Sequence, residues 1–337
     1  MEIRVFEAFS GYGSQHLALE RLRVDHPDLF SYNVVGISDI DSNALRAYSI
    51  LHEECPNFGD ISSIDWGLVP DFDLFTYSFP CTSISHIGKG TGLIEGSGTA
   101  SSLLWECQRA IEIKRPRYLL MENVRNLLSD RNKGEFRRWV SILESYGYKS
   151  FYQVLDSCNY NVPQHRERVF MVSILGGEYI FPKKMPLTRR LLDILDSDVD
   201  DSYYLRDNKL PDSALGVIND IFTGDYPVVY GWVRDSKGLI INWHPVSVAN
   251  CVTASKRHNT QNYVKETDGR VRKLTIAECF RLMGLLDSDI EKLINSDISK
   301  TALMKMAGNS IVVDVLYYLF RQMFIATDKK EEQLTLF

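Results

Sequence analysis

Residues 72–85 have the sequence FDLFTYSFPCTSIS. An apolar run ends at Tyr77, and a Pro-Cys pair follows at residues 80–81. The apolar run predicts a buried strand. Parallel sheets present their functional groups at the carboxyl ends of their strands, which makes Cys81 a candidate nucleophile. A free cysteine is more often a small buried hydrophobe. Cys81 alone therefore does not decide between catalysis and packing.

Strand-like and helix-like segments alternate on both sides of this stretch. Strands are expected at residues 4–9, 32–38, 72–77, 117–121, 151–155 and 169–175, and helices at 15–23, 42–52, 103–114 and 135–146. Short apolar strands that alternate with helices are typical of an α/β fold whose mostly parallel sheet is covered on both faces. We therefore predict a first domain over residues 1–178.

The pattern changes after this domain. Residues 179–295 contain prolines, a run rich in aspartate and an irregular mixture of polar and aromatic residues, which predicts a second, smaller domain. Residues 296–330 include an apolar helical segment at 311–324, which we expect to return to the first domain.

The composition narrows the class of protein. The chain has 337 residues, 45% of them hydrophobic, which is enough for a large core. The six cysteines form no Cys-x-x-Cys pair, so we expect neither a disulfide scaffold nor a metal site. No apolar run is long enough to span a membrane, and we expect a cytoplasmic protein without a membrane partner. The net charge of -6 means that nucleic-acid binding would depend on local basic patches.

A glycine-containing loop, Phe9-Ser-Gly-Tyr-Gly13, separates the first expected strand from the first expected helix. Glycines there let backbone N–H groups approach an anionic ligand. The loop is not a dinucleotide fingerprint, because the third glycine position falls on His16. Asp39 also lies farther from Gly11 than the roughly 20 residues typical of nicotinamide binders, which argues against an oxidoreductase.

Acidic residues follow the early strands. Asp39 is placed to hold ribose hydroxyls, although Asp39 or Asp41 could equally cap the next helix. Asp60 follows a turn glycine and could accept from an adenine amino group or simply cap a turn. Together with the glycine-containing loop after the first strand, these positions at successive strand ends favour a cofactor that contains adenosine.

A second set of polar residues accompanies Cys81. Glu122 ends an expected strand, as Cys81 does, and a carboxyl group there suits acid chemistry on the same substrate. Arg166 and Arg168 alternate before another strand and could supply fixed planar donors. Each feature taken alone is ordinary at a strand end or on a surface.

Taken together, the sequence resembles the DNA cytosine-5 methyltransferase family almost from end to end. The matching motifs, in order, are Phe9-Ser-Gly-Tyr-Gly13, Asp39, Gly59-Asp60, Phe79-Pro-Cys81, Glu122-Asn-Val124, Gln164-His-Arg-Glu-Arg168, Arg281-Leu-Met-Gly284 and Gly308-Asn-Ser310. A Pro-Cys pair alone carries no weight, whereas this ordered set is specific. The resemblance implies a Rossmann-like sheet of an S-adenosylmethionine-dependent methyltransferase at residues 1–178 and a target-recognition domain at 179–295.

The resemblance also implies a reaction, the transfer of a methyl group from S-adenosyl-L-methionine to C5 of a flipped-out cytosine in double-stranded DNA. Cys81 would attack C6, Glu122 would contact N3 and the N4 amino group, and Arg168 would hold O2 with Arg166 in support. The implied cofactor-binding residues are Phe9, Gly11, Tyr12, Gly13, Asp39, Ile40, Asp60, Ile61, Pro80, Asn309 and Ser310.

Contacts with DNA are expected from the loop after Cys81 and from a basic segment. Residues 252–273 contain six lysine or arginine residues and two acidic ones, interleaved with amides, which suits phosphate and base contacts. The implied DNA-binding residues are Ser85, His86, Thr253, Ser255, Lys256, Arg257 and Asn259. The glycine-rich residues 86–101 resemble the family's mobile catalytic loop.

Two positions depart from the family pattern, Thr82 in place of glutamine and Ala100 in place of arginine. Both lie where the family meets DNA, so they bear on loop closure more than on chemistry. The resemblance further implies a monomer and a restriction endonuclease as a functional partner. The alternatives are an RNA cytosine-5 methyltransferase and a catalytically silent DNA-binding relative.

Overall fold

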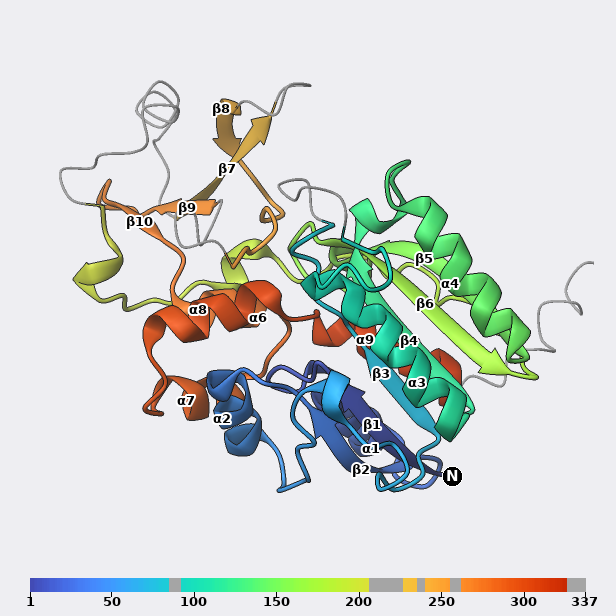
Figure 1. Ribbon diagram of the computed structural model, residues 1–337. Coiled ribbons are helices and arrows are strands. Elements are labelled where there is room, and N and C mark those ends of the chain that lie inside the picture. Colours follow the sequence, from blue (N-terminus) through green and yellow to red (C-terminus); the bar gives the residue numbers. More distant parts are fainter. Residues whose placement is uncertain (85–91, 206–226, 235–239, 255–261, 326–337) are drawn as a thin grey trace, which may run out of the picture. The chain divides into compact units, whose positions relative to one another are not determined.

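The structure is a computed structural model that describes residues 1–84, 92–205, 227–234, 240–254 and 262–325 (Figure 1). The chain divides into two compact units. Unit 1 comprises residues 1–155, 167–183 and 315–337, and unit 2 comprises residues 156–166 and 184–314. The functional roles expected for residues 1–178, 179–295 and 296–330 remain predictions.

Unit 1 is built on a six-stranded sheet in the order β2-β1-β3-β4-β6-β5. The strands are β1 (Glu2–Ala8), β2 (Ser31–Ser38), β3 (Leu74–Tyr77), β4 (Tyr118–Val124), β5 (Tyr148–Asp156) and β6 (Glu167–Leu175). Strands β2, β1, β3 and β4 are parallel, whereas β6 runs antiparallel to β4. The predicted α/β fold with a mostly parallel sheet is confirmed.

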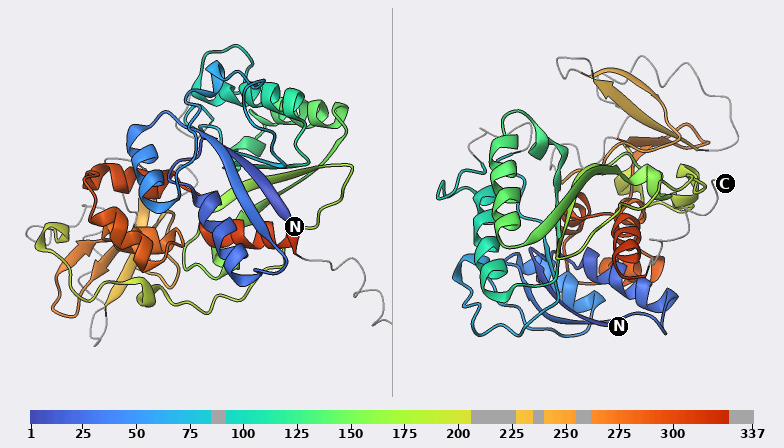
Figure 2. Two further views of the ribbon diagram at one scale, coloured as in Figure 1. Left: turned by 90° about the horizontal axis from the view of Figure 1, so that it is seen from below. Right: turned by 90° about the vertical axis from the view of Figure 1, so that its right-hand side faces the viewer.

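Helices cover both faces of this sheet (Figure 2). They are α1 (Ser14–Asp25), α2 (Ser42–Leu51), α3 (Leu104–Lys114), α4 (Lys133–Ser145) and α9 (Val313–Phe324). On one face, Trp105 of α3 packs edge-on against Trp139 of α4, which packs against Tyr77 of β3. On the other, Phe324 of α9 packs against Phe30 and Tyr118.

The strands bury both faces, and their side chains alternate as the pleat requires. Phe75 and Tyr77 of β3 and Met121 of β4 belong to the cluster that contains Trp105 and Trp139. Glu122 follows Met121 along β4, so the pleat turns its side chain to the opposite face. It is the one carboxyl group of β4, near the end of the strand and next to Asn123.

Unit 2 contains a four-stranded sheet in the order β10-β9-β7-β8 and a group of short helices. The strands are β7 (Val228–Arg234), β8 (Ile240–Pro245), β9 (Asn262–Lys265) and β10 (Val271–Lys273). The helices are α6 (Ile276–Leu282), α7 (Asp287–Ile294) and α8 (Lys300–Asn309). The segment expected to be irregular therefore includes two helices, α6 and α7, that the sequence did not predict.

Among the described residues, no single helix has the length and apolar character needed to cross a membrane, although α8 and α9 together pass that test as a bent pair.

Candidate active site

Cys81, Glu122 and Arg168 come from three adjacent strands of unit 1. Cys81 follows β3, and Glu122 lies near the carboxyl end of β4, which pairs with β3 in parallel. Arg168 lies at the start of antiparallel β6, opposite Val124. The direction of each strand thus brings all three residues to the same edge of the sheet.

The carboxylate of Glu122 and the guanidinium of Arg168 form an ion pair, with Nε 3.2 Å from Oε1. The two side chains are only 11% and 18% exposed, so solvent screens the pair less than it screens a surface pair. A fixed carboxylate beside a planar donor group can recognise a ring that has both donors and acceptors on its edge.

Three hydrogen bonds fasten the segment that carries Cys81. The amide of Asn123 donates to the carbonyl of Phe79 at 2.9 Å, which ties the segment to β4. The hydroxyl of Ser101 donates to the carbonyl of Pro80 at 2.6 Å and accepts from the backbone N–H of Ser83 at 3.3 Å. Backbone groups on both sides of Cys81 are therefore held, and its thiol is partly exposed.

Arg166 has a different environment from Arg168. It lies in unit 2, is 3% exposed, and its guanidinium donates to the carbonyl oxygens of Val252 (2.8 Å), Gly308 (2.9 Å) and Ser310 (2.6 Å). These bonds join three separate parts of unit 2. Arg166 therefore holds these backbone segments of unit 2 together.

The loop from Phe9 to Gly13 has the conformation that its glycines suggest. Gly11 and Gly13 both have left-handed backbone angles, with φ of +58° and +84°. Gly13 is the N-cap of α1 and offers no side chain to the helix N-terminus. A Cβ at Gly11 would meet nothing within 4 Å, so the backbone there borders open space.

Asp39 and Asp41 differ in their contacts, and only one of them caps the following helix. Asp41 caps α2, because its carboxylate accepts from the backbone N–H of Asn43 at 3.0 Å. Asp39 instead accepts from the backbone N–H of Gly11 at 2.8 Å and so joins the ends of β1 and β2. The adjacent Ile40 is 75% exposed, an unusual position for a large apolar side chain.

Asp60 is exposed and caps the short 3-10 helix Ile61–Ser63, accepting from the backbone N–H and the hydroxyl of Ser62 at 2.9 and 2.8 Å. Ile61 is buried. Asp60 thus caps a turn, which is one of the two roles that its sequence position suggested. Both hydrogen bonds use Oδ1, and a carboxylate has a second oxygen that can accept from other donors.

A buried polar group that the sequence did not single out lies beneath this loop. Glu7 of β1 is fully buried, and the hydroxyl of Tyr48 donates to it at 3.0 Å. Nδ1 of His16 lies 2.8 Å from that hydroxyl, and the ring of His16 stacks on His52 at 4.0 Å. Nε2 of His52 in turn donates to the carbonyl of Tyr12 at 2.9 Å, so the group supports the loop from below.

The residues expected to contact cofactor or DNA from unit 2 are only partly described. Asn309 is exposed at the end of α8, and Ser310 and Thr253 are partly buried. Ser85, His86, Ser255, Lys256, Arg257 and Asn259 lie outside the described residues.

Two arginines of the basic segment are already paired. Arg272 is fully buried between Glu278 (2.9 Å) and Glu266 (2.5 Å). Arg270 pairs with Asp268 at 2.6 Å and Asp201 at 3.1 Å. Arg272 is therefore buried away from solvent, whereas Arg270 is half exposed, and the contribution of this segment to DNA binding stays a prediction.

The sequence did not single out Asn123 and Ser101 as supports of the Cys81 segment. Asn123 lies inside the Glu122-Asn-Val124 motif and Ser101 ends the glycine-rich segment, and a single amide or hydroxyl is a weak signal by itself.

Comparisons with known proteins agree with this arrangement. A model of the C-5 cytosine-specific DNA methylase family matches residues 3–325. Type II methyltransferase M2.ScrFI of Lactococcus lactis subsp. cremoris is 35% identical, over 96% of this chain and 99% of that protein. Type II methyltransferase M.Bsp6I of Bacillus sp. is 32% identical, over 93% and 96%.

Solved structures show the same fold. The Dnmt2 methyltransferase of S. pombe superposes with a TM-score of 0.70 at 22% identity, over 94% of this chain and 97% of that one. The methyltransferase EhMeth of Entamoeba histolytica gives 0.70 at 17% identity, over 96% and 98%.

Proposed function

Because this chain belongs to the C-5 cytosine-specific DNA methylase family, and is a DNA cytosine-5-methyltransferase, we propose a specific reaction for it. It transfers a methyl group from S-adenosyl-L-methionine to C5 of a cytosine rotated out of a short double-stranded DNA sequence, through a covalent bond between Cys81 and C6. The family membership inferred from the sequence motifs is confirmed by these matches.

The observation that supports this proposal most is the meeting of Cys81, Glu122 and Arg168 at one edge of the sheet. A thiol, a carboxyl group and a guanidinium are the groups that attack on C6 and recognition of the cytosine edge require. Glu122 and Arg168 lie in paired strands, and hydrogen bonds from Asn123 and Ser101 hold the segment after β3 that carries Cys81.

The first step makes C5 reactive. C5 of cytosine is a poor nucleophile while the ring is aromatic. When the Cys81 thiol loses its proton to solvent and its sulfur electron pair forms a bond to C6, C5–C6 becomes a single bond. Its electron pair moves into a C4–C5 enamine while the C4–N3 double bond opens and N3 takes a proton from Glu122. C5 would then bond to the methyl group as the methyl–sulfur bond breaks and S-adenosylhomocysteine leaves, and N3 would return its proton to Glu122 as the C4–N3 double bond re-forms.

Glu122 and Arg168 stabilise this addition. Glu122 in its protonated form donates to N3, where negative charge develops, and its other oxygen accepts from the N4 amino group. Arg168 donates to O2. Thymine has a carbonyl at position 4 and a proton on N3, so the same pair of residues rejects it.

Elimination completes the cycle. The proton on C5 passes to a base, and the electron pair of that C–H bond re-forms the C5–C6 double bond. The sulfur of Cys81 leaves C6 with its electron pair, which regenerates the enzyme.

The loop between β1 and α1 fits S-adenosyl-L-methionine. The backbone at Gly11 borders open space, and Gly13 leaves the N-terminal N–H groups of α1 without a side-chain cap. We place Phe9, Gly11, Tyr12 and Gly13 along the cofactor. Its methylsulfonium group supplies an electrophilic methyl.

The other proposed contacts with the cofactor extend this loop. Asp39 and Ile40 lie at the ribose, Asp60 and Ile61 at the adenine, and Pro80, Asn309 and Ser310 complete the site. The proposed contacts with DNA are Ser85, His86, Thr253, Ser255, Lys256, Arg257 and Asn259. We propose a monomer that protects DNA within a restriction–modification system, since two relatives carry the name type II methyltransferase.

The experiment that tests this function is conversion sequencing of an unmethylated plasmid incubated with purified protein and S-adenosyl-L-methionine. We expect protected cytosines within one short recurring sequence, and no protection with Cys81→Ser. Protein that binds the cofactor but protects no cytosine in DNA would overturn the proposal. Methylation of RNA under the same conditions would identify an RNA enzyme.

A further inference from the structure

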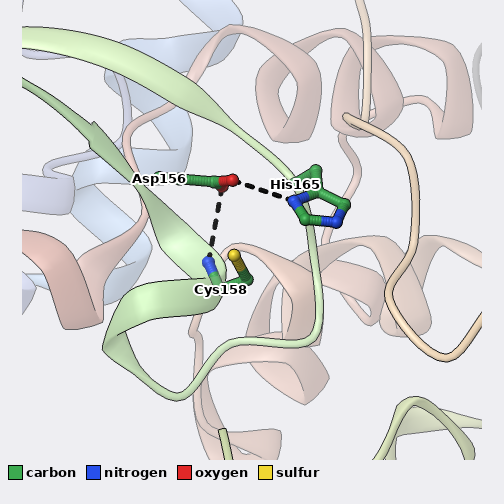
Figure 3. Close-up of side chains that lie close together, drawn as sticks. All are labelled: Asp156, Cys158 and His165. Atoms are coloured by element: carbon green, nitrogen blue, oxygen red, sulfur yellow. Dashed lines mark hydrogen bonds and ion pairs between the residues drawn. The ribbon is translucent and has the colours of Figure 1, made fainter. Parts of the chain in front are cut away.

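Three residues with different ligand atoms converge in unit 2, outside the set assigned above. They are Asp156, Cys158 and His165, and their ligand atoms all lie within 4.8 Å of one another (Figure 3). Nδ1 of His165 lies 2.8 Å from Oδ2 of Asp156. The absence of a Cys-x-x-Cys pair does not exclude a mixed set of this kind.

The chain builds this group locally. Asp156 is the N-cap of the short 3-10 helix Ser157–Tyr160, and its Oδ1 accepts from the backbone N–H of Cys158 at 3.5 Å and of Arg166 at 2.8 Å. One carboxylate oxygen is thus anchored by backbone donors, which leaves Oδ2 to face His165. Metal-binding carboxylates are oriented by such outer hydrogen bonds.

We propose that Asp156, Cys158 and His165 form a binding site for a divalent transition-metal ion of the zinc type. Carboxylate oxygen, thiolate sulfur and imidazole nitrogen are all zinc ligands, at about 2.0–2.3 Å, which places ligand atoms of a tetrahedral ion roughly 3.3–3.8 Å apart. The observed separations, all within 4.8 Å, lie within about 1.5 Å of this spacing.

The site is open on one side. The side chain of His165 is 57% exposed and that of Asp156 is 17% exposed, so a fourth position faces solvent. Three protein ligands with an open fourth position are typical of zinc sites that keep a water molecule or bind a further ligand.

Binding of the metal ion releases one proton, that of the Cys158 thiol. The S–H bond of Cys158 breaks, its proton goes to solvent, and a sulfur–metal bond forms. The hydrogen bond between Asp156 and His165 is replaced by an oxygen–metal and a nitrogen–metal bond. The two anionic ligands match the charge of the ion, so the occupied site is neutral. Because protons compete with the ion for the ligand atoms, binding weakens as pH falls.

An ion here would close the segment of residues 156–165 into a ring. This segment leads directly into Arg166, which holds three backbone carbonyls of unit 2, and then into Arg168. We expect the ion to stabilise unit 2, independently of any methyl transfer.

Cobalt titration of the untagged full-length protein, stripped with chelator under reducing conditions, tests the site. Co²⁺ serves as the probe because a cobalt–thiolate bond gives a near-ultraviolet charge-transfer band. We expect one equivalent to bind in the micromolar range or tighter, and zinc to displace it. Cys158→Ser should abolish the band, and Asp156→Asn and His165→Gln should each weaken binding by at least about tenfold.

Cys55→Ser is the matched control, since Cys55 is another partly exposed thiol and belongs to unit 1. It should keep the band and the affinity. Zinc should also raise the melting temperature of the wild type and of Cys55→Ser, but not of Cys158→Ser. A band that is absent from the wild type, survives in Cys158→Ser, or appears only at millimolar cobalt would overturn the site.

Discussion

At the scale of single residues, Glu7 is the most unusual titratable group near the cofactor loop. Burial raises the pKa of this carboxyl group to about 8, against a hydrogen bond from Tyr48 that lowers it. Three neighbouring groups, His16, Tyr48 and Cys55, have pKa values shifted toward their uncharged forms. Burial lowers the pKa of His16 to about 3 and raises those of Tyr48 and Cys55.

This shift predicts how stability depends on pH. The ordinary pKa of glutamate is 4.5, so between about pH 4.5 and 8 the folded state binds a proton that the unfolded state has lost. The stabilising contribution is complete below 4.5 and is lost as pH rises through 8. Burial of His16 has the opposite effect on stability, and that effect ends at the ordinary histidine pKa of 6.5. From pH 6.5 to 8, His16 therefore no longer opposes the change due to Glu7.

The variant Glu7→Gln keeps an acceptor for Tyr48 and removes the titration. We expect the free energy of unfolding of the wild type to fall by about 2 kcal/mol between pH 6.5 and 8, and that of the variant to stay nearly level. Urea unfolding at several pH values measures both. Parallel curves for the two proteins would show that Glu7 titrates normally.

Glu122 carries the second prediction at this scale. Glu122→Gln preserves shape but cannot donate a carboxyl proton to N3 and loses its charge beside Arg168. We expect kcat to fall by roughly 10²–10³-fold with the fold unchanged. Glu167→Gln is the control, because Glu167 is an exposed acid paired with Arg125 at 2.7 Å in the same unit. Equal losses in both variants would remove Glu122 from the chemistry.

At the scale of elements, the connection between β1 and α1 distinguishes packing from ligand binding. A Cβ at Gly13 would lie 2.3 Å from Nε2 of His52 and 2.8 Å from the ring of Tyr48, whereas a Cβ at Gly11 would meet nothing within 4 Å. Both positions have positive φ, which costs a residue with a side chain about 1–2 kcal/mol.

These differences predict that one alanine variant mainly loses stability and the other mainly loses cofactor affinity. Gly13→Ala should lose clearly more stability than Gly11→Ala, because it adds a clash to the backbone strain. Gly11→Ala should lower affinity for S-adenosyl-L-methionine by at least about tenfold, since its methyl group enters the space assigned to the cofactor. Urea unfolding and calorimetric titration measure the two effects. Unchanged affinity in Gly11→Ala would place the cofactor elsewhere.

The elements of unit 1 could be predicted because their strands are short, apolar and separated by amphipathic helices. The antiparallel direction of β6 could not, since it follows from the short connection after β5, which is too short for a parallel crossover with a helix. Helices α6 and α7 are only 7 and 8 residues long, so periodicity gives little signal. The reciprocal bonds between Thr275 and Glu278 at the start of α6 were a readable start signal.

At the scale of the whole molecule, a buried ion pair joins the sheet of unit 2 to its helices. Arg272 of β10 and Glu278 of α6 are both fully buried and lie 2.9 Å apart. A charge in such a place is costly when its partner is removed. The pair therefore makes β10 and α6 depend on each other for stability.

Arg272→Ala should destabilise the protein by about 3–5 kcal/mol, because it leaves the Glu278 carboxylate buried without its partner. Arg270→Ala is the matched control, since Arg270 is half exposed, and its loss should cost no more than about 1 kcal/mol. Thermal unfolding, with limited proteolysis to locate the change in unit 2, measures both. Similar small losses would show that the Arg272 pair contributes little.

The count of charged residues in a segment does not show which of those charges are paired in the folded protein. Arg270 and Arg272 look like part of a basic DNA-binding segment in the sequence, yet each is paired within unit 2. Pairing partners far apart in the chain, such as Arg270 and Asp201, cannot be read from local composition. By contrast, Cys81, Glu122 and Arg168 could be selected from the sequence, because each belongs to a motif of the ordered set and lies in or shortly after a predictable strand.

The most direct test of the account is whether Cys81 bonds to cytosine. A DNA fragment in which 5-fluorocytosine replaces cytosine blocks the last step, because fluorine cannot leave C5 as the proton does. With S-adenosyl-L-methionine present, we predict a stable protein–DNA adduct that peptide mass spectrometry assigns to Cys81, and none with Cys81→Ser. An adduct at another cysteine, or one that persists in Cys81→Ser, would contradict the mechanism.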